Sequence, residues 1–287
     1  MSHIVSPDLV KDRIERLPLL SATASALLQL LQREQYSQAE VVRLVETDAA
    51  LTTCILKVVN APSFGLGQQV HSVARAVSFL GDKLVTAIAL GNCAHQVYNH
   101  ALGGYEGSAG QLWEHSLATA IAAREFARLM TPPVPLGLAF TAGIVHDIGK
   151  SVLSEFLEGR SQSLLETLDA QEIEDFALAE AQALGTDHAR LGALLARRWQ
   201  LPEPLVQAIA YHHTPSRAAP PWQGLCCAVH LGDALAMCLG LDTGCDALQY
   251  GLDDLTCATP DLSPAVMDVL VFTVHHEFQK TRTMFFG

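Results

Sequence analysis

The stretch Ala142-Gly143-Ile144-Val145-His146-Asp147-Ile148-Gly149-Lys150 places an adjacent histidine and aspartate in an otherwise apolar helix. Two polar side chains on a buried stripe cost free energy unless a partner satisfies them. Neighbours on a helix point about 100° apart and seldom reach one partner, unless, as here, a nearby glycine lets other backbone pack close. A metal ion would satisfy both groups, because imidazole and carboxylate are metal ligands. We therefore expect a metal site around His146 and Asp147.

Further potential ligands lie in the second half of the chain, on or at the ends of predicted helices: His115, His188, His212, His213 and Asp233. With His146 and Asp147 they make a set of seven, which can hold two ions. Mixed imidazole and carboxylate ligands suit iron, manganese, zinc or nickel better than an all-oxygen magnesium site. The sequence leaves open whether His212, His213 or both face the metals.

Asp147 is the natural carboxylate to bridge two ions, and Lys150 follows it by one helical turn. A lysine facing the same cavity could hold a phosphate oxygen or stabilise developing charge. Asp147 and Lys150 are therefore the candidate catalytic residues. Arg124, Arg197 and Arg198 are further candidates for binding an anionic substrate.

Each ligand alone is weak support, because a single inward histidine is more often a hydrogen-bonded core residue. Asp233 could likewise cap a helix or pair locally. The remaining histidines match no part of the pattern and are interpreted as surface or packing residues: His3, His71, His95, His100, His230, His275 and His276. The sequence has no G-x-S-x-G elbow, P-loop or G-x-G-x-x-G motif, so the metal cluster is its only chemical signal.

Helical periodicity runs through the whole chain, which predicts an all-α fold. Ser6-Pro7 and the capping box Ser37-Gln38-Ala39-Glu40 mark helix starts, and Asp48 marks another. In the second half we expect helices near 110–130, 137–157, 161–184, 187–199, 203–213 and 222–240. The Gly-rich break at 103–108 suggests an N-terminal helical subdomain over 1–105, a metal-binding helical core over 106–240 and a C-terminal helical extension over 241–287.

The chain carries 18 basic and 30 acidic residues, a formal charge of −12, which disfavours direct binding to nucleic acid or anionic membranes. The longest weakly polar stretches, such as 84–94, fall short of the roughly 20 apolar residues of a membrane span. No secretory signal opens the sequence, so we expect a cytoplasmic protein. Eight acidic residues against one base between Ser151 and Thr186 indicate a solvated anionic face or a docking site for a basic partner.

The order of ligands resembles the HD metal-phosphohydrolase superfamily: Trp113-Glu114-His115-Ser116, then the His146-Asp147 doublet, then later histidines and a closing Asp233. The match is closer to its HDOD branch and covers roughly residues 14 to 240. Its motifs are Leu17-Pro18-Leu19-Leu20, Val45-Glu46-Thr47-Asp48-Ala49-Ala50-Leu51-Thr52, Val58-Val59-Asn60-Ala61, Ala76-Val77-Ser78-Phe79-Leu80-Gly81, Gly143 to Lys150, Leu184-Gly185-Thr186-Asp187-His188 and Trp199-Gln200-Leu201-Pro202.

This resemblance implies an all-helical regulatory output module of bacterial signal transduction that binds a signalling protein partner. It leaves a second hypothesis open, because superfamily members with a working site use two or more metals to activate water against a phosphoester. The alternative is therefore a metal-dependent phosphohydrolase that acts on a nucleotide or another small phosphoester ligand. The sequence gives no oligomeric state.

The related HD-GYP branch hydrolyses cyclic di-GMP, but this sequence departs from it. There is no Gly-Tyr-Pro, Thr214-Pro215 follows the histidine doublet, and Ala118 stands where that branch typically carries arginine. These departures weaken a cyclic di-GMP phosphodiesterase interpretation without touching the metal ligands.

Overall fold

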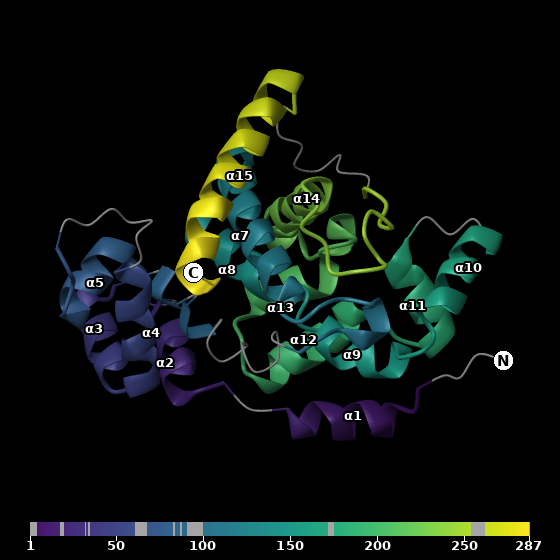
Figure 1. The fold of residues 1–287 in the computed structure, drawn as a ribbon, viewed down its shortest axis with the longest axis horizontal. Helices are drawn as coiled ribbons and strands as arrows, with labels where there is room; N and C mark the ends of the chain where they lie inside the picture. The colour runs from purple at the N-terminus through teal and green to yellow at the C-terminus, as the bar shows by residue number, and fades with distance from the viewer. Residues whose placement is uncertain are drawn as a thin grey trace.

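The computed structural model describes residues 5–17, 20–31, 33, 35–60, 68–82, 84–86, 88–90, 100–171, 175–253 and 262–286. Regular structure in these ranges is helical, apart from one isolated bridge between Leu102 and Gly107. The predicted all-α fold is confirmed. Figure 1 shows a small lobe of helices α2 to α5, a larger body around α7 and α14, and a long C-terminal helix, α15, lying along that body.

The small lobe has its own hydrophobic core. It consists of α2 (Ala22–Leu31), α3 (Gln38–Glu46), α4 (Ala49–Val59) and α5 (Val73–Leu80). These helices bury their apolar stripes against one another, and the core includes Leu27, Val41, Val45, Leu51, Ile55 and Val77. Amphipathic helices of this length depend on such burial for their stability.

The predicted helix starts in this half are confirmed. The side chain of Glu40 accepts a 2.8 Å hydrogen bond from the backbone N–H of Ser37, as a capping box requires. Asp48 accepts one of 3.0 Å from the N–H of Leu51. Pro7 opens α1 (Pro7–Arg16), where its missing N–H costs nothing.

Helix α1 lies against the larger body and away from the small lobe, as Figure 1 shows. Val10 and Ile14 belong to the main hydrophobic cluster. The guanidinium of Arg198 donates hydrogen bonds to the carbonyls of Glu15 (2.7 Å) and Leu17 (2.9 Å). The division of the chain near residues 105 and 240 stays a prediction.

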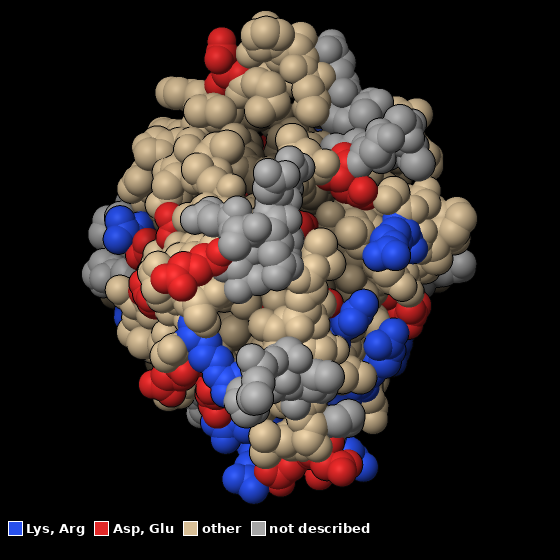
Figure 2. Space-filling model, turned by 90° about the vertical axis from the view of Figure 1, so that its right-hand side faces the viewer, with Lys and Arg blue, Asp and Glu red and all other residues tan. Residues whose placement is uncertain are grey.

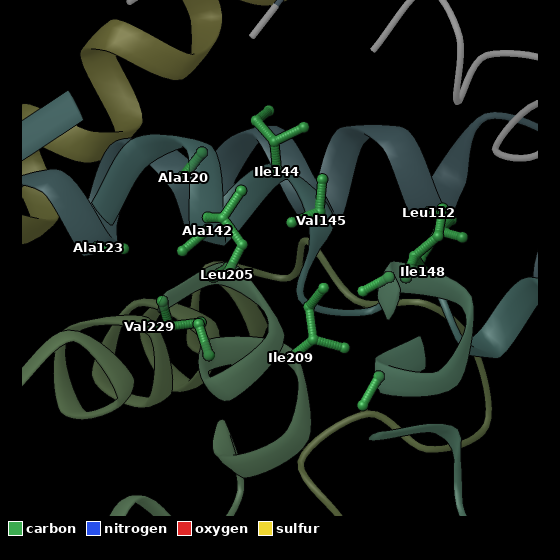
Figure 3. Packing of buried hydrophobic residues seen from close by; sticks show 14 of the residues in the cluster. Leu112, Ala120, Ala123, Ala142, Ile144, Val145, Ile148, Leu205, Ile209 and Val229 are labelled. Carbon is green, nitrogen blue, oxygen red and sulfur yellow. The ribbon is translucent and has the colours of Figure 1, made fainter. Parts of the chain in front are cut away.

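The centre of the body is formed by α7 (Gln111–Leu129), α8 (Leu136–Val145) and α14 (Gln223–Cys238), which pack at very short range. A Cβ atom at Gly143 would lie 2.5 Å from the Cα of Ala120, and one at Gly232 would lie 2.7 Å from the nitrogen of Ala123. Figure 3 shows the small residues at this packing, with side chains of α13 (Glu203–Tyr211) beside them. This close packing fixes the helices that carry the site.

Two of the predicted helices are each divided in the structure. The predicted helix 137–157 consists of α8 and α9 (Lys150–Leu157), with a turn over 146–149 between them. The predicted helix 161–184 consists of α10 (Ser161–Gln171) and α11 (Phe176–Leu184). Helix α11 has its own N-cap, Asp175, whose carboxylate accepts from the N–H of Leu178 at 3.0 Å. Neither break was predicted, because the residues on both sides of each break have the spacing of a helix.

The segment Leu136–Leu157 is, over 22 residues, long and apolar enough to meet the length and composition criteria for a membrane span. It exceeds the longest stretches expected from the sequence. However, 83% of its most apolar window is buried inside the fold, and it contains the His146-Asp147 doublet. It is the central helix pair of the body.

Acidic and basic side chains are interspersed on the face near α10 and α11, as Figure 2 shows. One of the acidic residues counted there, Glu180, is fully buried and faces inward. Another, Glu155, forms an ion pair with Arg13 of α1. The anionic face is therefore smaller than the count of residues suggests.

Candidate metal centre

The turn over 146–149 places the His-Asp doublet at the junction of α8 and α9. Gly149 lies against the first turn of α12 (His188–Arg198): a Cβ atom there would lie 1.8 Å from the carbonyl oxygen of His188. Only glycine fits this approach. The predicted role of a glycine, which lets other backbone pack close to the doublet, is therefore confirmed, and it brings His188 to Asp147.

One group of ligand atoms surrounds one oxygen of Asp147. The Nε2 atoms of His115 and His146 each lie 3.5 Å from Asp147 Oδ2, and 3.3 Å from each other. Asp233 Oδ1 lies 3.0 Å from His115 Nε2 and 3.7 Å from His146 Nε2. These four side chains come from α7, the end of α8 and α14.

A second group surrounds the other oxygen of Asp147. The Nε2 atoms of His188 and His212 lie 3.4 and 3.5 Å from Asp147 Oδ1. His188 Nε2 is 3.3 Å from His212 Nε2 and 2.9 Å from His213 Nε2. Both members of the His212-His213 doublet therefore face this group, and Asp147 lies between the two groups with one oxygen toward each.

The hydrogen bonds of the rings determine which nitrogen carries the proton. The Nδ1 atoms of His115, His146 and His212 donate to the backbone carbonyls of Leu241 (2.7 Å), Gly143 (2.8 Å) and Ile209 (2.8 Å). His188 Nδ1 donates to the Glu180 carboxylate at 2.7 Å. In the neutral rings each Nε2 therefore keeps its lone pair, and these lone pairs converge.

Converging lone pairs and unpaired carboxylate oxygens fit a metal. Both oxygens of Asp147 and Oδ1 of Asp233 are buried and accept no hydrogen bond of good geometry, although Asp147 Oδ2 lies 2.7 Å from the ammonium of Lys150. An ion at about 2.0–2.1 Å from its ligands separates neighbouring ligand atoms by roughly 3.0–3.4 Å, close to the distances found here. Buried polar atoms without partners are costly, so a divalent cation is the partner that this cluster lacks.

The charges around the cluster also favour a cation. Asp147, Asp233, Glu180 and Asp246 are buried carboxylates around a single buried ammonium, that of Lys150. Although burial alone would raise the pKa of Asp147, Lys150 holds that pKa well below its usual range. The carboxylate of Asp147 would therefore stay ionised at neutral pH.

The surroundings of the cluster shift the pKa values of two of its histidines in opposite directions. Burial disfavours charge on His188, yet the Glu180 carboxylate outweighs it and raises the pKa to about 9. Burial lowers the pKa of His212 to about 4, so this ring is a neutral ligand. A site that draws a proton onto His188 when no metal is present draws a metal cation for the same reason.

Lys150 faces the cluster, as predicted, with its Nζ 2.7 Å from Asp147 Oδ2. The same Nζ lies 2.6 Å from Asp246 Oδ2, so its charge is already shared between two carboxylates. The arginines suggested for substrate binding have other partners: Arg124 pairs with Glu277, and Arg198 donates to carbonyls at the end of α1.

Several residues of the site were missed from the sequence. Glu180 orients His188 and accepts a 2.6 Å hydrogen bond from the hydroxyl of Tyr105. Asp246 holds Lys150, and Tyr250 donates to Asp246 at 2.7 Å. No sequence motif marks these residues as part of a metal site. They reach the ligands only through the folding of the chain.

The other histidines follow the expected division where the structure describes them. His230 is buried and donates from Nδ1 to the carbonyl of His212 at 2.7 Å, a packing role. Exposed positions are occupied by His71, His100, His275 and His276. His3 and His95 lie outside the described residues.

Replacing Glu180 with Gln should weaken metal binding by about 10- to 100-fold, the usual effect of losing a carboxylate behind a histidine ligand. The amide can offer its NH₂ group to His188 Nδ1, which favours the tautomer with the proton on Nε2. The metal dissociation constant of Glu180→Gln, measured by competition with a chelator, tests this. Glu158→Gln on the exposed surface is the control. Equal affinity for the wild type and Glu180→Gln would contradict the assigned role.

Three of the comparisons with solved structures place the fold among known proteins. An HDOD domain protein of unknown function from Geobacter sulfurreducens is 19% identical, with 98% of each chain covered and a TM-score of 0.72. A candidate signal transduction protein from Marinobacter aquaeolei VT8 is 23% identical, with 97% of this chain and 64% of that chain covered and a TM-score of 0.71. A candidate phosphohydrolase from Shewanella amazonensis SB2B is 20% identical, with 96% of each covered and a TM-score of 0.65.

At the sequence level, an uncharacterised protein of Treponema pallidum (strain Nichols) is 26% identical over 207 residues, which are 71% of this chain and 39% of that protein. The chain therefore spans about two fifths of this relative's length. The HDOD domain model matches residues 17–215, which is more than half of the chain. On this match, and with the all-α fold that its structural neighbours share, the chain belongs to the HDOD domain family.

Proposed function

We propose that this chain is a regulatory output protein of signal transduction that carries a buried centre of two divalent transition-metal ions, of iron, manganese, zinc or nickel. One ion would be held by His115, His146, Asp147 and Asp233, and the other by Asp147, His188, His212 and His213. A signalling protein is the proposed partner. The similarity in fold to a candidate signal transduction protein is consistent with this role.

The observation that carries the proposal is the burial of the ligands. All seven side chains are between 0 and 6% exposed. A catalytic metal keeps a coordination position that substrate can reach, whereas a closed ligand set is typical of a structural metal. A sealed centre supports a role in folding or sensing over turnover of a dissolved substrate.

The second candidate is a metal-dependent phosphohydrolase that acts on a nucleotide or another phosphoester. It is favoured by the complete ligand set and by the ammonium of Lys150, 2.7 Å from Asp147. Two bound divalent ions would supply an activated water and polarise a phosphoryl oxygen. In that case Asp147 would hold both ions and Lys150 would bind a phosphate oxygen.

A measurement of turnover distinguishes the two candidate functions. Manganese- or iron-loaded protein would be incubated with a panel of nucleotides and cyclic dinucleotides, with Asp147→Ala as the matched control. We expect no more hydrolysis product, separated by chromatography, than with the control, while elemental analysis shows metal in the wild type. Turnover that disappears in Asp147→Ala would instead identify a phosphohydrolase. Folded wild-type protein that takes up no metal would contradict both candidates.

A further inference from the structure

Residues 241–253, which we name the strap, lie across the metal cluster. At its start, the carbonyl of Leu241 accepts the hydrogen bond from His115 Nδ1 at 2.7 Å. Further along, the ring of Tyr250 stacks on the ring of His213, with centroids 4.2 Å apart and planes 12° apart. At its end, the backbone N–H of Asp253 donates to His230 at 3.2 Å. The strap therefore contacts ligands of both groups.

The middle of the strap is held by a buried polar network. Asp246 is 1% exposed, and its carboxylate lies 2.6 Å from Lys150 Nζ. Lys150 also donates to the hydroxyl of Thr243 at 2.9 Å, and the hydroxyl of Tyr250 donates to Asp246 at 2.7 Å. Two strap side chains thus bond one lysine and a third, Tyr250, bonds Asp246, while the lysine itself pairs with Asp147.

The outer side of the strap contributes little apolar burial. Leu248 and Leu252 are 65% and 69% exposed, so neither anchors the strap to the core. Inner residues Asp246 and Tyr250 alternate with these two leucines along the chain. Attachment at this part of the strap therefore rests on the lysine network, on the tyrosine stacked over His213, and on backbone hydrogen bonds from Cys245 to Tyr105 (2.7 Å) and from Phe176 to Gln249 (2.8 Å).

The strap begins beside a surface pocket. This pocket has a volume of about 330 Å³ and is lined by the first turn of α7 and by residues 240–242, with the carboxylates of Glu114 and Asp242 among its walls. Gln111 donates to Asp242 at 2.8 Å and fixes that wall. Leu241 lines the pocket, and its carbonyl accepts the hydrogen bond from the ligand His115. One strap residue therefore contacts both the pocket and the metal cluster.

We propose that the strap is the gate of the metal centre: divalent cations enter and leave only when residues 241–253 move off the cluster, and Asp246 and Tyr250 keep the gate closed over bound metal. This inference rests on the proposed metal centre. A gate is needed because all seven ligands are buried, and the strap contacts ligands of both groups.

Charge gives the reason why closure and metal retention are coupled. Cations bound at Asp147 would compete with the ammonium of Lys150 for the negative charge of that carboxylate. Asp246 then remains as the carboxylate that neutralises the buried ammonium, and an unpaired buried ammonium is costly. The loaded centre therefore favours the closed strap, and by reciprocity the closed strap retains metal.

Metal release tests the gate. Loaded wild-type protein and the variants Asp246→Asn, Tyr250→Ala and Leu252→Ala would be mixed with an excess of a coloured chelator and followed by stopped-flow absorbance. Asp246→Asn and Tyr250→Ala should release metal about tenfold faster or more, because each loses a buried hydrogen bond to a charged group. Leu252→Ala should match the wild type, since its side chain lies on the outer face of the same segment.

The failure of the gate and the failure of the metal centre give different results. Wild-type protein without metal would overturn the proposed centre and the gate with it. Metal bound by all four proteins and released at one common rate would overturn the gate alone.

A second measurement needs no variant and remains decisive if Asp246→Asn does not fold. Hydrogen exchange of the wild type should be faster without metal than with metal at the strap amides of Cys245 and Asp253, which donate to Tyr105 and His230. Equal exchange at these amides in the two states would overturn the coupling.

Discussion

Replacing Asp147 with Ala is expected to remove nearly all bound metal, the largest loss of any single substitution in this chain. One Asp147 oxygen faces His115 and His146, and the other faces His188 and His212, at distances of 3.4 to 3.5 Å. One substitution therefore takes a charged ligand from both groups. Losing a group behind a ligand already costs about 10- to 100-fold in affinity, so losing a shared ligand should cost more than about a hundredfold.

Elemental analysis after gel filtration in buffer with a low level of free metal measures this loss, with Asp268→Ala on the exposed face of α15 (Pro264–Phe286) as control. Metal that binds only the folded state raises the melting temperature, so this rise should also vanish in Asp147→Ala. A variant that retains half or more of the wild-type metal would show that the two groups do not share this carboxylate.

Gly149→Ala should destabilise the fold strongly and disturb the metal centre at the same time. The added Cβ would lie 1.8 Å from the carbonyl oxygen of His188 and 2.6 Å from the nitrogen of Gly192. Both are backbone atoms, so α9 and α12 must move apart to admit the methyl group. Overpacking of this kind costs about 1–3 kcal/mol, and more where backbone must shift.

The melting temperature should fall by about 2–4 °C for each kcal/mol lost, and metal affinity should fall because His188 moves with its helix. Gly103→Ala is the matched control, since the atoms near its Cβ belong to the Glu158 side chain at 3.6 Å or more. Gly149→Ala with the stability and metal content of the control would refute the close packing at the doublet.

Much of the fold and the ligand set could be predicted because the signals are local or strongly periodic. Caps such as the one at Asp48 depend on residues three positions apart, and the apolar spacing identifies the helices. The seven ligands stand out because histidine and aspartate are rarely placed on apolar helix faces without a partner. A glycine near the doublet was expected to let other backbone pack close, but the sequence did not distinguish Gly149 from Gly143 in this role.

The other residues of the site could not be predicted, because they depend on contacts between segments far apart in the sequence. Glu180 lies in an acid-rich stretch whose composition indicates a solvated surface, and only the packing of α11 on α12 turns it toward His188. Asp246 meets Lys150 across 96 positions from a segment without helical periodicity. The break after Val145 was not predicted, since apolar residues at helical spacing lie on both sides of the turn over 146–149.

Anomalous X-ray diffraction from crystals of the metal-loaded protein, collected above and below the absorption edge of the bound metal, tests the central claim most directly. The account predicts two strong anomalous peaks on either side of Asp147, one beside His115 and His146 and the other beside His188 and His212. A map from well-ordered crystals of metal-soaked protein with no peak within bonding distance of Asp147 would contradict it.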